Sequence, residues 1–309
     1  MRTILFVKTS SLGDVVHNCP AVTDAARALP GAAIDWMVEE PFAGIARMHR
    51  SVRRVIPVAA RRWRAALWQP AVWSEIGAWR RELRGARYDA VVDTQSLVKS
   101  ALLGKLARGT HHGMDRASAR EPLAALLYDA RHAVPRDLHA VERNRLLAGQ
   151  ALGYAVQGPP DYGLSVPAAG KSGYVVLLTM TSRAHKLWPE ARWIELGRGL
   201  RAPAILPWGS EAERARAERI ASAVGGKVPE RMELEDLARL FAGAQSVVGL
   251  DTGLTHLAAA LGARTVGIYC GSDPALTGIF GAPRARNVGA AGREPAVAEA
   301  VDALRQAPG

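Results

Sequence analysis

Residues 3–15 read TILFVKTSSLGDV, an apolar run followed by a polar loop and the first turn of a helical pattern. Thr3–Val7 predicts a buried β-strand, and Val15–Leu29 predicts an amphipathic helix. Residues 174–190 read YVVLLTMTSRAHKLWPE and repeat this plan, again with a lysine in the loop. Strands that alternate with helices in this way predict parallel sheets. We therefore expect an α/β protein with two Rossmann-like domains that face one central cleft.

Other short apolar runs alternate with helical patterns along the chain. The predicted strands are Thr3–Val7, Ile34–Val38, Arg54–Val58, Asp89–Asp93, Tyr174–Leu178, Ala204–Leu206, Ser246–Leu250 and Thr265–Tyr269. The predicted helices are Val15–Leu29, Pro41–His49, Ala71–Arg84, Leu97–Ala107, Pro122–Asp129, His139–Leu152, Glu190–Leu200, Glu211–Val224, Leu234–Ala242, Gly253–Leu261 and Ala296–Leu304. In such folds ligands bind at the carboxyl ends of the strands, so the loops that follow strands are the places to search for a site.

The chain has 309 residues, which is the length of about two ordinary domains. The segment from Gly153 to Gly173 has no long periodic stretch and contains two clusters rich in proline and glycine, so we interpret it as a linker. The predicted domains are therefore 1–155 and 156–309, with the last helix able to pack back on the first domain.

Composition excludes several classes of protein. Hydrophobic residues make up 49% of the chain and charged residues 22%, as in globular domains. The two cysteines, Cys19 and Cys270, are too few for a secreted disulfide scaffold and are typical of a reduced, cytoplasmic protein; we expect Cys19 to be a small core residue. No apolar run approaches the ~20 residues of a membrane span, and the apolar start is too short for a signal peptide.

The positive charge is concentrated in one half of the chain. The chain holds 40 Lys and Arg against 29 Asp and Glu, a formal net charge of +11. Residues 1–155 contain 23 basic and 14 acidic side chains, a net charge of +9, whereas residues 156–309 contain 17 and 15, a net charge of +2. This asymmetry implies an acidic partner for the first half: nucleic acid, anionic lipid or a phosphorylated substrate.

The stretch from Arg47 to Arg64 contains seven arginines and no acidic residue. Such a run is usually a solvated face. Arginine forks beside Trp63 also suit bidentate capture of phosphate or carboxylate. No zinc-finger, helix-turn-helix or RNA-binding signature accompanies the charge, so we do not expect nucleic acid as a partner.

The loop from Lys8 to Asp14 lies between a strand and a helix, where backbone N–H groups and hydroxyls form an anion- and sugar-binding lip. Asp14 is the single carboxylate in this loop. It can face a ligand bound at this lip, or it can cap the helix, which is a frequent role for aspartate. The residues by themselves favour the cap.

The corresponding loop of the second half, residues 179–189, ends with Pro189, a residue suited to the first helical turn. Its hydroxyl groups together with Arg183 and Lys186 suit a diphosphate without a metal ion. The alternative is a solvated basic loop.

Residues 249–256 read GLDTGLTH and bring Asp251, Thr252 and Gly253 to the start of a predicted helix. Gly253 permits close backbone approach, and the helix N-terminus favours a phosphate. His256 lies one turn into this helix, where it faces the same ligand or packs inside the domain.

Standard phosphate and metal motifs are absent from the sequence. The residues GKS at 170–172 resemble the end of a Walker A loop, but Ser165 stands where that loop needs a glycine, and no G-x-G-x-x-G follows the first strand. His111 and His112 would point to opposite faces of a strand, so they do not form a metal site together. We expect no metal and no cofactor.

Six blocks occur in an order and spacing that resemble one family. They are KTSSLGD at 8–14, RRWR at 61–64, GMD at 113–115 with AREPL at 119–123, KLWP at 186–189, LPWG at 206–209 and DTGLTH at 251–256. Over nearly the whole chain, this pattern resembles the lipopolysaccharide heptosyltransferase I family, part of glycosyltransferase family 9. The resemblance implies a GT-B fold with an N-terminal acceptor domain and a C-terminal nucleotide-sugar domain.

The resemblance also implies substrates and roles. The donor would be ADP-L-glycero-β-D-manno-heptose and the acceptor the first Kdo of Kdo2-lipid A, at the cytoplasmic face of the inner membrane with peripheral contact to its anionic surface. The implied catalytic residues are Asp14, as general base, and Lys186. The implied donor-binding residues are Thr181, Ser182, Lys186, Glu213, Met232, Asp251, Thr252, Gly253 and His256. Among these, Asp251 would contact the heptose, and Glu213 and Met232 the adenosine. The implied acceptor-binding residues are Ser10, Arg61, Arg62, Arg64, Lys99 and Arg120.

Two positions depart from the family pattern. Ser182 stands where a second threonine is common, and His185 stands where an acid is frequent. The alternatives to this reading are heptosyltransferase II with a heptosylated acceptor, a nucleotide-sugar epimerase of the same fold, and a basic module that binds membrane or nucleic acid without catalysis.

Overall fold

The computed structural model describes residues 1–167, 173–181 and 183–308, and the chain forms two compact units, Met1–Gly163 and Leu164–Gly309. The units divide later than the 155/156 boundary expected from the sequence. Asp161 forms ion pairs with Arg27, at 3.0 Å, and with Arg50. These contacts attach this part of the predicted linker to the first unit.

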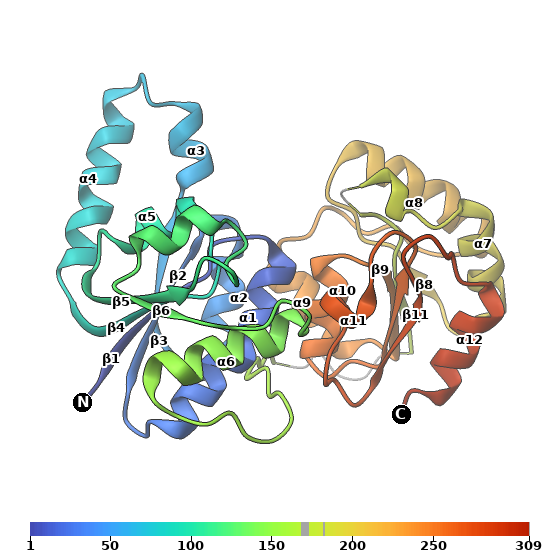
Figure 1. The fold of residues 1–309 in the computed structure, drawn as a ribbon. Helices are drawn as coiled ribbons and strands as arrows, with labels where there is room; N and C mark the ends of the chain where they lie inside the picture. Colours follow the sequence, from blue (N-terminus) through green and yellow to red (C-terminus); the bar gives the residue numbers. More distant parts are fainter. Residues whose placement is uncertain (168–172, 182, 309) are drawn as a thin grey trace. The chain divides into compact units, whose positions relative to one another are not determined.

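The first unit contains a six-stranded sheet whose neighbouring strands are all parallel, in the order β3-β2-β1-β4-β5-β6 (Figure 1). The strands are β1 (Thr3–Val7), β2 (Ala33–Glu39), β3 (Val52–Val58), β4 (Arg87–Asp93), β5 (Arg108–Met114) and β6 (Ala130–His132). The helical elements are α1 (Leu12–Ala28), η1 (Glu40–Phe42), α2 (Ala43–Arg47), α3 (Ala60–Ala65), α4 (Pro70–Arg84), α5 (Val98–Gly104), η2 (Pro122–Leu127) and α6 (Ala140–Leu152). The strand order reverses between β1 and β4, and this switch point is where doubly wound sheets bind ligands.

The four strands predicted for the first half are confirmed, but β5 and β6 were not predicted. The sequence of β5, RGTHHGM, has few of the apolar residues that mark a strand. Its glycines have a packing reason, because a Cβ at Gly113 would lie 2.2 Å from the ring of Tyr128. The predicted helix Pro122–Asp129 is the 3₁₀ helix η2, and Pro41–His49 is split into η1 and α2.

Helices α3 and α4 form a hairpin that projects from the sheet of the first unit (Figure 1). The sequence pattern predicts α4 but no element over residues 61–64. Trp63 on α3 and Trp79 on α4 are each 6% exposed and meet edge to face, with ring centroids 5.5 Å apart. This buried pair joins the two helices to the core below them.

The second unit contains a five-stranded parallel sheet in the order β11-β10-β9-β7-β8. The strands are β7 (Val175–Leu178), β8 (Ala204–Ile205), β9 (Ser246–Leu250), β10 (Thr265–Tyr269) and β11 (Ala285–Gly289). The helical elements are η3 (Ala184–Lys186), α7 (Glu190–Gly199), α8 (Glu211–Val224), α9 (Leu234–Gly243), α10 (Gly253–Ala260), α11 (Pro274–Thr277) and α12 (Val297–Gln306). The switch point lies between β7 and β9, and the polar strand β11 was not predicted.

The core of this unit is aromatic where α7 begins. Trp188 and Trp193 are fully buried and contact each other edge to face, with ring centroids 5.1 Å apart.

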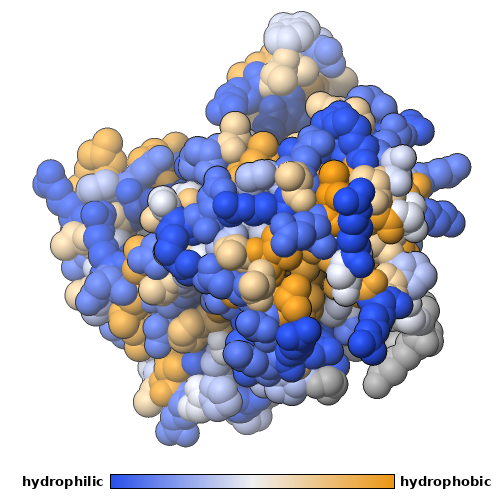
Figure 2. Space-filling view, turned by 90° about the vertical axis from the view of Figure 1, so that its right-hand side faces the viewer, coloured by the Kyte–Doolittle hydropathy of each residue, from blue (hydrophilic) through white to orange (hydrophobic). Residues whose placement is uncertain are grey.

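Hydrophilic side chains surround separate hydrophobic patches on the face of the molecule that Figure 2 shows. No helix in the described part of the chain is long and apolar enough to cross a membrane.

Candidate active site

In the first unit, the loops after β1 and β4 are joined by side chains at the switch point. Gln95 Oε1 accepts hydrogen bonds from the backbone N–H groups of Thr9 (3.1 Å) and Ser10 (3.2 Å). Asp93 in turn accepts the backbone N–H groups of Gln95 (2.8 Å) and Ser96 (3.2 Å). Ser10, a predicted acceptor residue, is thereby held at the carboxyl end of the sheet. Asp93 and Gln95 were not predicted, although their position at the end of a predicted strand is a signal that could have found them.

Asp14 lies in the first turn of α1. Its Oδ2 accepts the backbone N–H of Ser11 at 2.8 Å and the Ser11 hydroxyl at 3.3 Å, which is the geometry of a capping box. Arg120 Nη1 lies 3.6 Å from the same oxygen. Oδ1 takes no part in these contacts, and the Asp14 side chain is 28% exposed. Asp14 therefore caps the helix through Oδ2, and its Oδ1 is left for another role.

Lys8 is a buried lysine near Asp14, and no role for it was predicted from the sequence. Its Nζ donates to the carbonyl of Thr94 at 2.8 Å and to Asn144 Oδ1 at 3.3 Å. Burial lowers the pKa of Lys8, and the carboxylates of Asp14 and Asp93 act in the opposite direction. Its signal was present in the sequence, because it follows directly on the buried run of β1.

Lys99 and Arg120, two predicted acceptor residues, lie on segments that are tied together. Lys99 is in the first turn of α5, and Glu121 Oε2 accepts the backbone N–H of Val98 at 2.7 Å at the start of the same helix. Lys99 Nζ lies 3.9 Å from Glu39 Oε1. Burial raises the pKa of Glu39, while Lys99 opposes this effect.

The three predicted acceptor arginines on α3 have different surroundings. Arg62 is held by two carboxylates: its guanidinium donates to Glu40 at 3.0 and 3.1 Å and to Glu75 at 2.9 and 2.6 Å. It therefore connects α3 to η1 and α4. Arg61 and Arg64 are exposed. The structure thus separates Arg62, which two carboxylates hold, from the exposed Arg61 and Arg64, of which Arg61 lies close enough to Glu39 to lower the pKa of its carboxyl group.

In the second unit, Asp251 is the centre of a cluster that includes three other predicted donor residues. Its Oδ2 lies 2.5 Å from Lys186 Nζ, its Oδ1 lies 3.4 Å from His256 Nε2, and its backbone carbonyl accepts the Thr181 hydroxyl at 3.1 Å. The family resemblance implies separate contacts for these two residues, Lys186 with the diphosphate and Asp251 with the heptose. In the structure, Lys186 and Asp251 pair with each other.

The charge state of Asp251 follows from these contacts. Burial by itself would raise the pKa of Asp251, but hydrogen bonds from His256, Lys186 and Ser272 outweigh burial and hold it below the usual range. The carboxylate is therefore ionised at neutral pH. It forms a fixed negative charge next to the cation expected to meet the diphosphate.

Ser272 is a member of this cluster that was not predicted from the sequence. Its hydroxyl donates to Asp251 Oδ2 at 2.5 Å. It follows β10, the neighbour of β9, so its place after a predicted strand was the available signal. Gly271 permits this arrangement, because a Cβ there would lie 2.5 Å from His185 Cδ2 and 2.9 Å from the His185 carbonyl.

The N-terminus of α10 is the candidate phosphate position. Thr252 is the N-cap residue, but its side chain makes no cap hydrogen bond, and Gly253 is the first residue of the helix. The first-turn N–H groups therefore lack a side-chain acceptor from Thr252 and point toward the carboxyl end of the sheet. A diphosphate oxygen can accept hydrogen bonds there.

The predicted adenosine residues lie after β8. Glu213 is in the first turn of α8, and its Oε2 accepts the backbone N–H of Gly209 at 2.7 Å. Met232 is in the segment before α9, where Trp208 Nε1 donates to the carbonyl of Pro229 at 2.8 Å. Ser182 lies outside the described residues. Within the described ranges, no group of three or more His, Cys, Asp or Glu side chains is arranged to hold a metal ion.

The sequence profile of glycosyltransferase family 9 (heptosyltransferase) matches residues 76–303. Lipopolysaccharide heptosyltransferase 1 of Salmonella typhimurium is 47% identical over 291 residues, which cover 90% of this chain and 91% of that protein. The chain belongs to glycosyltransferase family 9. It is therefore a glycosyltransferase, which decides against the epimerase and the non-catalytic module.

Solved structures of heptosyltransferases agree with this assignment. E. coli heptosyltransferase WaaC with ADP superposes with a TM-score of 0.92 at 41% identity and covers 100% of both chains. The same enzyme with ADP-2-deoxy-2-fluoro heptose has a TM-score of 0.86 at 42% identity, over 99% of this chain and 98% of that chain. E. coli heptosyltransferase II has a TM-score of 0.77 at 19% identity over 99% of each, which shows a shared fold. The expected GT-B architecture of two parallel-sheet α/β domains is confirmed.

Proposed function

We propose that this family 9 enzyme transfers L-glycero-D-manno-heptose from ADP-heptose to the first Kdo of Kdo2-lipid A, with inversion at the anomeric carbon. The observation that carries the proposal is the 47% identity, over 90% of the chain, to a lipopolysaccharide heptosyltransferase 1. The charge distribution supports it, because lipid phosphates and Kdo carboxylates are anionic and the first half is basic. The enzyme would act at the cytoplasmic face of the inner membrane.

In the proposed reaction, Asp14 accepts the proton of an acceptor hydroxyl through the oxygen that the helix cap leaves unused. The hydroxyl oxygen forms a bond to the anomeric carbon while the bond from that carbon to the ADP oxygen breaks on the opposite face. Lys186 and the N-terminus of α10 stabilise the negative charge that develops on the leaving diphosphate. For this, Lys186 exchanges part of its contact with Asp251 for the diphosphate.

The test is incubation of the purified protein with ADP-heptose and Kdo2-lipid A, with the product identified by mass. We expect one added heptose and one ADP released per acceptor. Heptosyltransferase II is the second candidate, and it would leave Kdo2-lipid A unchanged while extending an acceptor that already carries one heptose. Release of ADP that does not depend on any acceptor would contradict both proposals.

We predict that transfer needs no divalent metal ion. Lys186 and backbone N–H groups supply the positive charge that a metal ion would otherwise bring to the diphosphate. Activity should therefore stay within about twofold of its starting value when EDTA is added. Loss of turnover in EDTA that Mg²⁺ or Mn²⁺ restores would overturn this prediction.

The exposed arginines of α3 should affect the acceptor more than the donor. Replacing Arg61 and Arg64 together with Ala should raise the acceptor KM on the order of 10-fold, because each loses an exposed contact with an anion. The affinity for ADP should not change. Added salt should weaken acceptor binding in the wild type and matter less in the double variant.

Arg62 provides the comparison for this prediction. Arg62→Ala leaves Glu40 and Glu75 without their shared cation, so we expect a lower melting temperature that the Arg61 and Arg64 variants do not show. Acceptor kinetics that stay unchanged in the double variant would assign Arg61 and Arg64 to an ordinary solvated face.

A further inference from the structure

Three large apolar side chains are exposed at the tip of the α3–α4 hairpin. Leu67 is 42% exposed, Trp68 76% and Trp73 59%. Trp73 Nε1 donates to the carbonyl of Leu67 at 2.8 Å, and Trp68 is the next residue in the chain after Leu67. Exposed tryptophan in such a cluster marks a surface that meets another apolar phase.

The outward face of α4 continues from this tip as a stripe of arginines. Trp73, Gly77, Arg80, Arg81 and Arg84 are spaced by four, three, one and three positions, which places them on one side of a helix. The opposite side of α4 is buried through Val72, Trp79 and Leu83. The stripe therefore faces away from the core along the whole helix.

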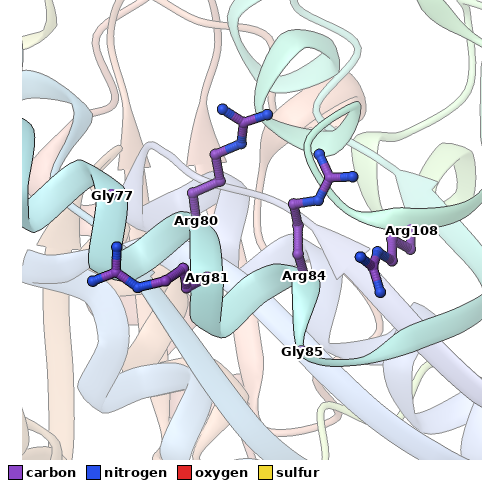
Figure 3. Close-up of a pocket in the computed structure, with 6 residues that line it drawn as sticks. All are labelled: Gly77, Arg80, Arg81, Arg84, Gly85 and Arg108. Atoms are coloured by element: carbon purple, nitrogen blue, oxygen red, sulfur yellow. The ribbon is translucent and has the colours of Figure 1, made fainter.

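The arginine end of the stripe surrounds a hollow of about 540 Å³, which Figure 3 shows. Its lining residues are Gly77, Arg80, Arg81, Arg84, Gly85 and Arg108. The two glycines have no side chains to fill the hollow. The other four lining residues are arginines, and no carboxylate is among the lining residues. These side chains have no ion pair with any residue in the described ranges. Such a concentration of one charge attracts an anionic partner.

We propose that this face of α4 docks the enzyme on an anionic lipid bilayer. The tryptophans at the tip would lie at the level of the lipid headgroups, where amphipathic rings are stable. The guanidinium groups of the hollow would bind lipid phosphates, which suit their planar forks. The apolar tip suits the nonpolar part of an anionic membrane surface, and the basic hollow suits its negative charge. The proposal rests on the proposed function, because a membrane-bound acceptor gives the enzyme a reason to be at that surface.

The experiment is co-sedimentation of the full chain with vesicles of phosphatidylcholine alone and with vesicles that also contain phosphatidylglycerol. Wild-type protein should bind the anionic vesicles, and salt should weaken the binding. Arg80→Gln, Arg81→Gln and Arg84→Gln in one variant should weaken it on the order of 100-fold, since each basic residue near such a surface contributes about fivefold. Trp68→Ser with Trp73→Ser should also weaken it.

A matched control removes three exposed arginines from the second unit, by Arg198→Gln, Arg201→Gln and Arg305→Gln, and this variant should bind anionic vesicles like the wild type. Equal losses in the control and in the α4 variant would overturn the proposal, because net charge would then explain the binding. Unchanged binding in the α4 arginine variant would also overturn it. Circular dichroism and melting temperature verify that each variant is folded.

Heptose transfer to a detergent-dispersed acceptor separates this proposal from the proposed function. The α4 variants should keep that activity within a few-fold of the wild type, because their changes lie outside the site residues. A wild-type protein that binds anionic vesicles but transfers no heptose would contradict only the proposed function. A wild-type protein that transfers heptose but does not bind anionic vesicles would contradict only the docking proposal.

Discussion

Asp14→Asn is expected to slow heptose transfer by on the order of 10²- to 10⁴-fold, which corresponds to about 3–5 kcal/mol in the barrier. An amide does not accept a proton at neutral pH, so a general base cannot survive this change. The helix cap can survive it, because the Asn oxygen can still accept the Ser11 N–H that Asp14 now accepts at 2.8 Å. The variant should fold, melt near the wild-type temperature and bind ADP, and its kcat should be measured with both substrates saturating.

Ser11→Ala is the control for this prediction. It removes the Ser11 hydroxyl, which lies 3.3 Å from Asp14 Oδ2, and leaves the carboxylate in place. Loss of an N-cap side chain costs about 0.5–2 kcal/mol of stability, so a lower melting temperature with near-normal kcat is expected. If Asp14→Asn also keeps a near-normal kcat, Asp14 is a helix cap and the base is another residue.

Lys186→Ala is expected to weaken ADP binding by roughly 10- to 150-fold, the equivalent of a charge-assisted hydrogen bond of about 1.5–3 kcal/mol. The kcat should fall further, on the order of 10²- to 10³-fold, since the charge on the diphosphate grows as the bond to the sugar breaks. Calorimetric titration with ADP and steady-state kinetics measure the two effects separately. Lys227→Ala removes an exposed lysine of the same unit and should change neither.

Comparison with Asp251→Asn distinguishes two roles for Lys186. Lys186 can bind the diphosphate, or it can serve only to hold Asp251 in place. Lys186 Nζ lies 2.5 Å from Asp251 Oδ2, so replacing either residue removes the same ion pair. If the lysine binds the diphosphate, ADP affinity should fall in Lys186→Ala and persist in Asp251→Asn, while Asp251→Asn should weaken binding of the complete ADP-heptose. Equal losses of ADP affinity in both variants would show that the ion pair itself, rather than the lysine, maintains the site.

The local pattern of apolar residues was enough to predict the strands that carry the site. β1, β7 and β9 are buried, largely apolar runs, and β4 ends in a buried apolar stretch before Asp93, so the carboxyl ends of these strands could be located from the sequence. The loops after β1, β7 and β9 were for this reason identified as candidate sites. β5 was missed because its glycines serve contacts with residues distant in sequence: Gly113 accommodates the ring of Tyr128, whose hydroxyl donates to Asp93 at 2.8 Å.

The sequence alone was sufficient for the family, the fold class and the loops that hold Asp14, Lys186 and Asp251, because strand–loop–helix units and motif spacing are properties of neighbouring residues. Tertiary structure decided which partner each charged side chain has. Arg62 and Arg64 are two positions apart, yet Arg62 is held by two carboxylates and Arg64 faces solvent. Lys186 and Asp251 lie 65 positions apart and share an ion pair. Coulomb attraction and burial depend on distance in space, and only the folded sheets set that distance.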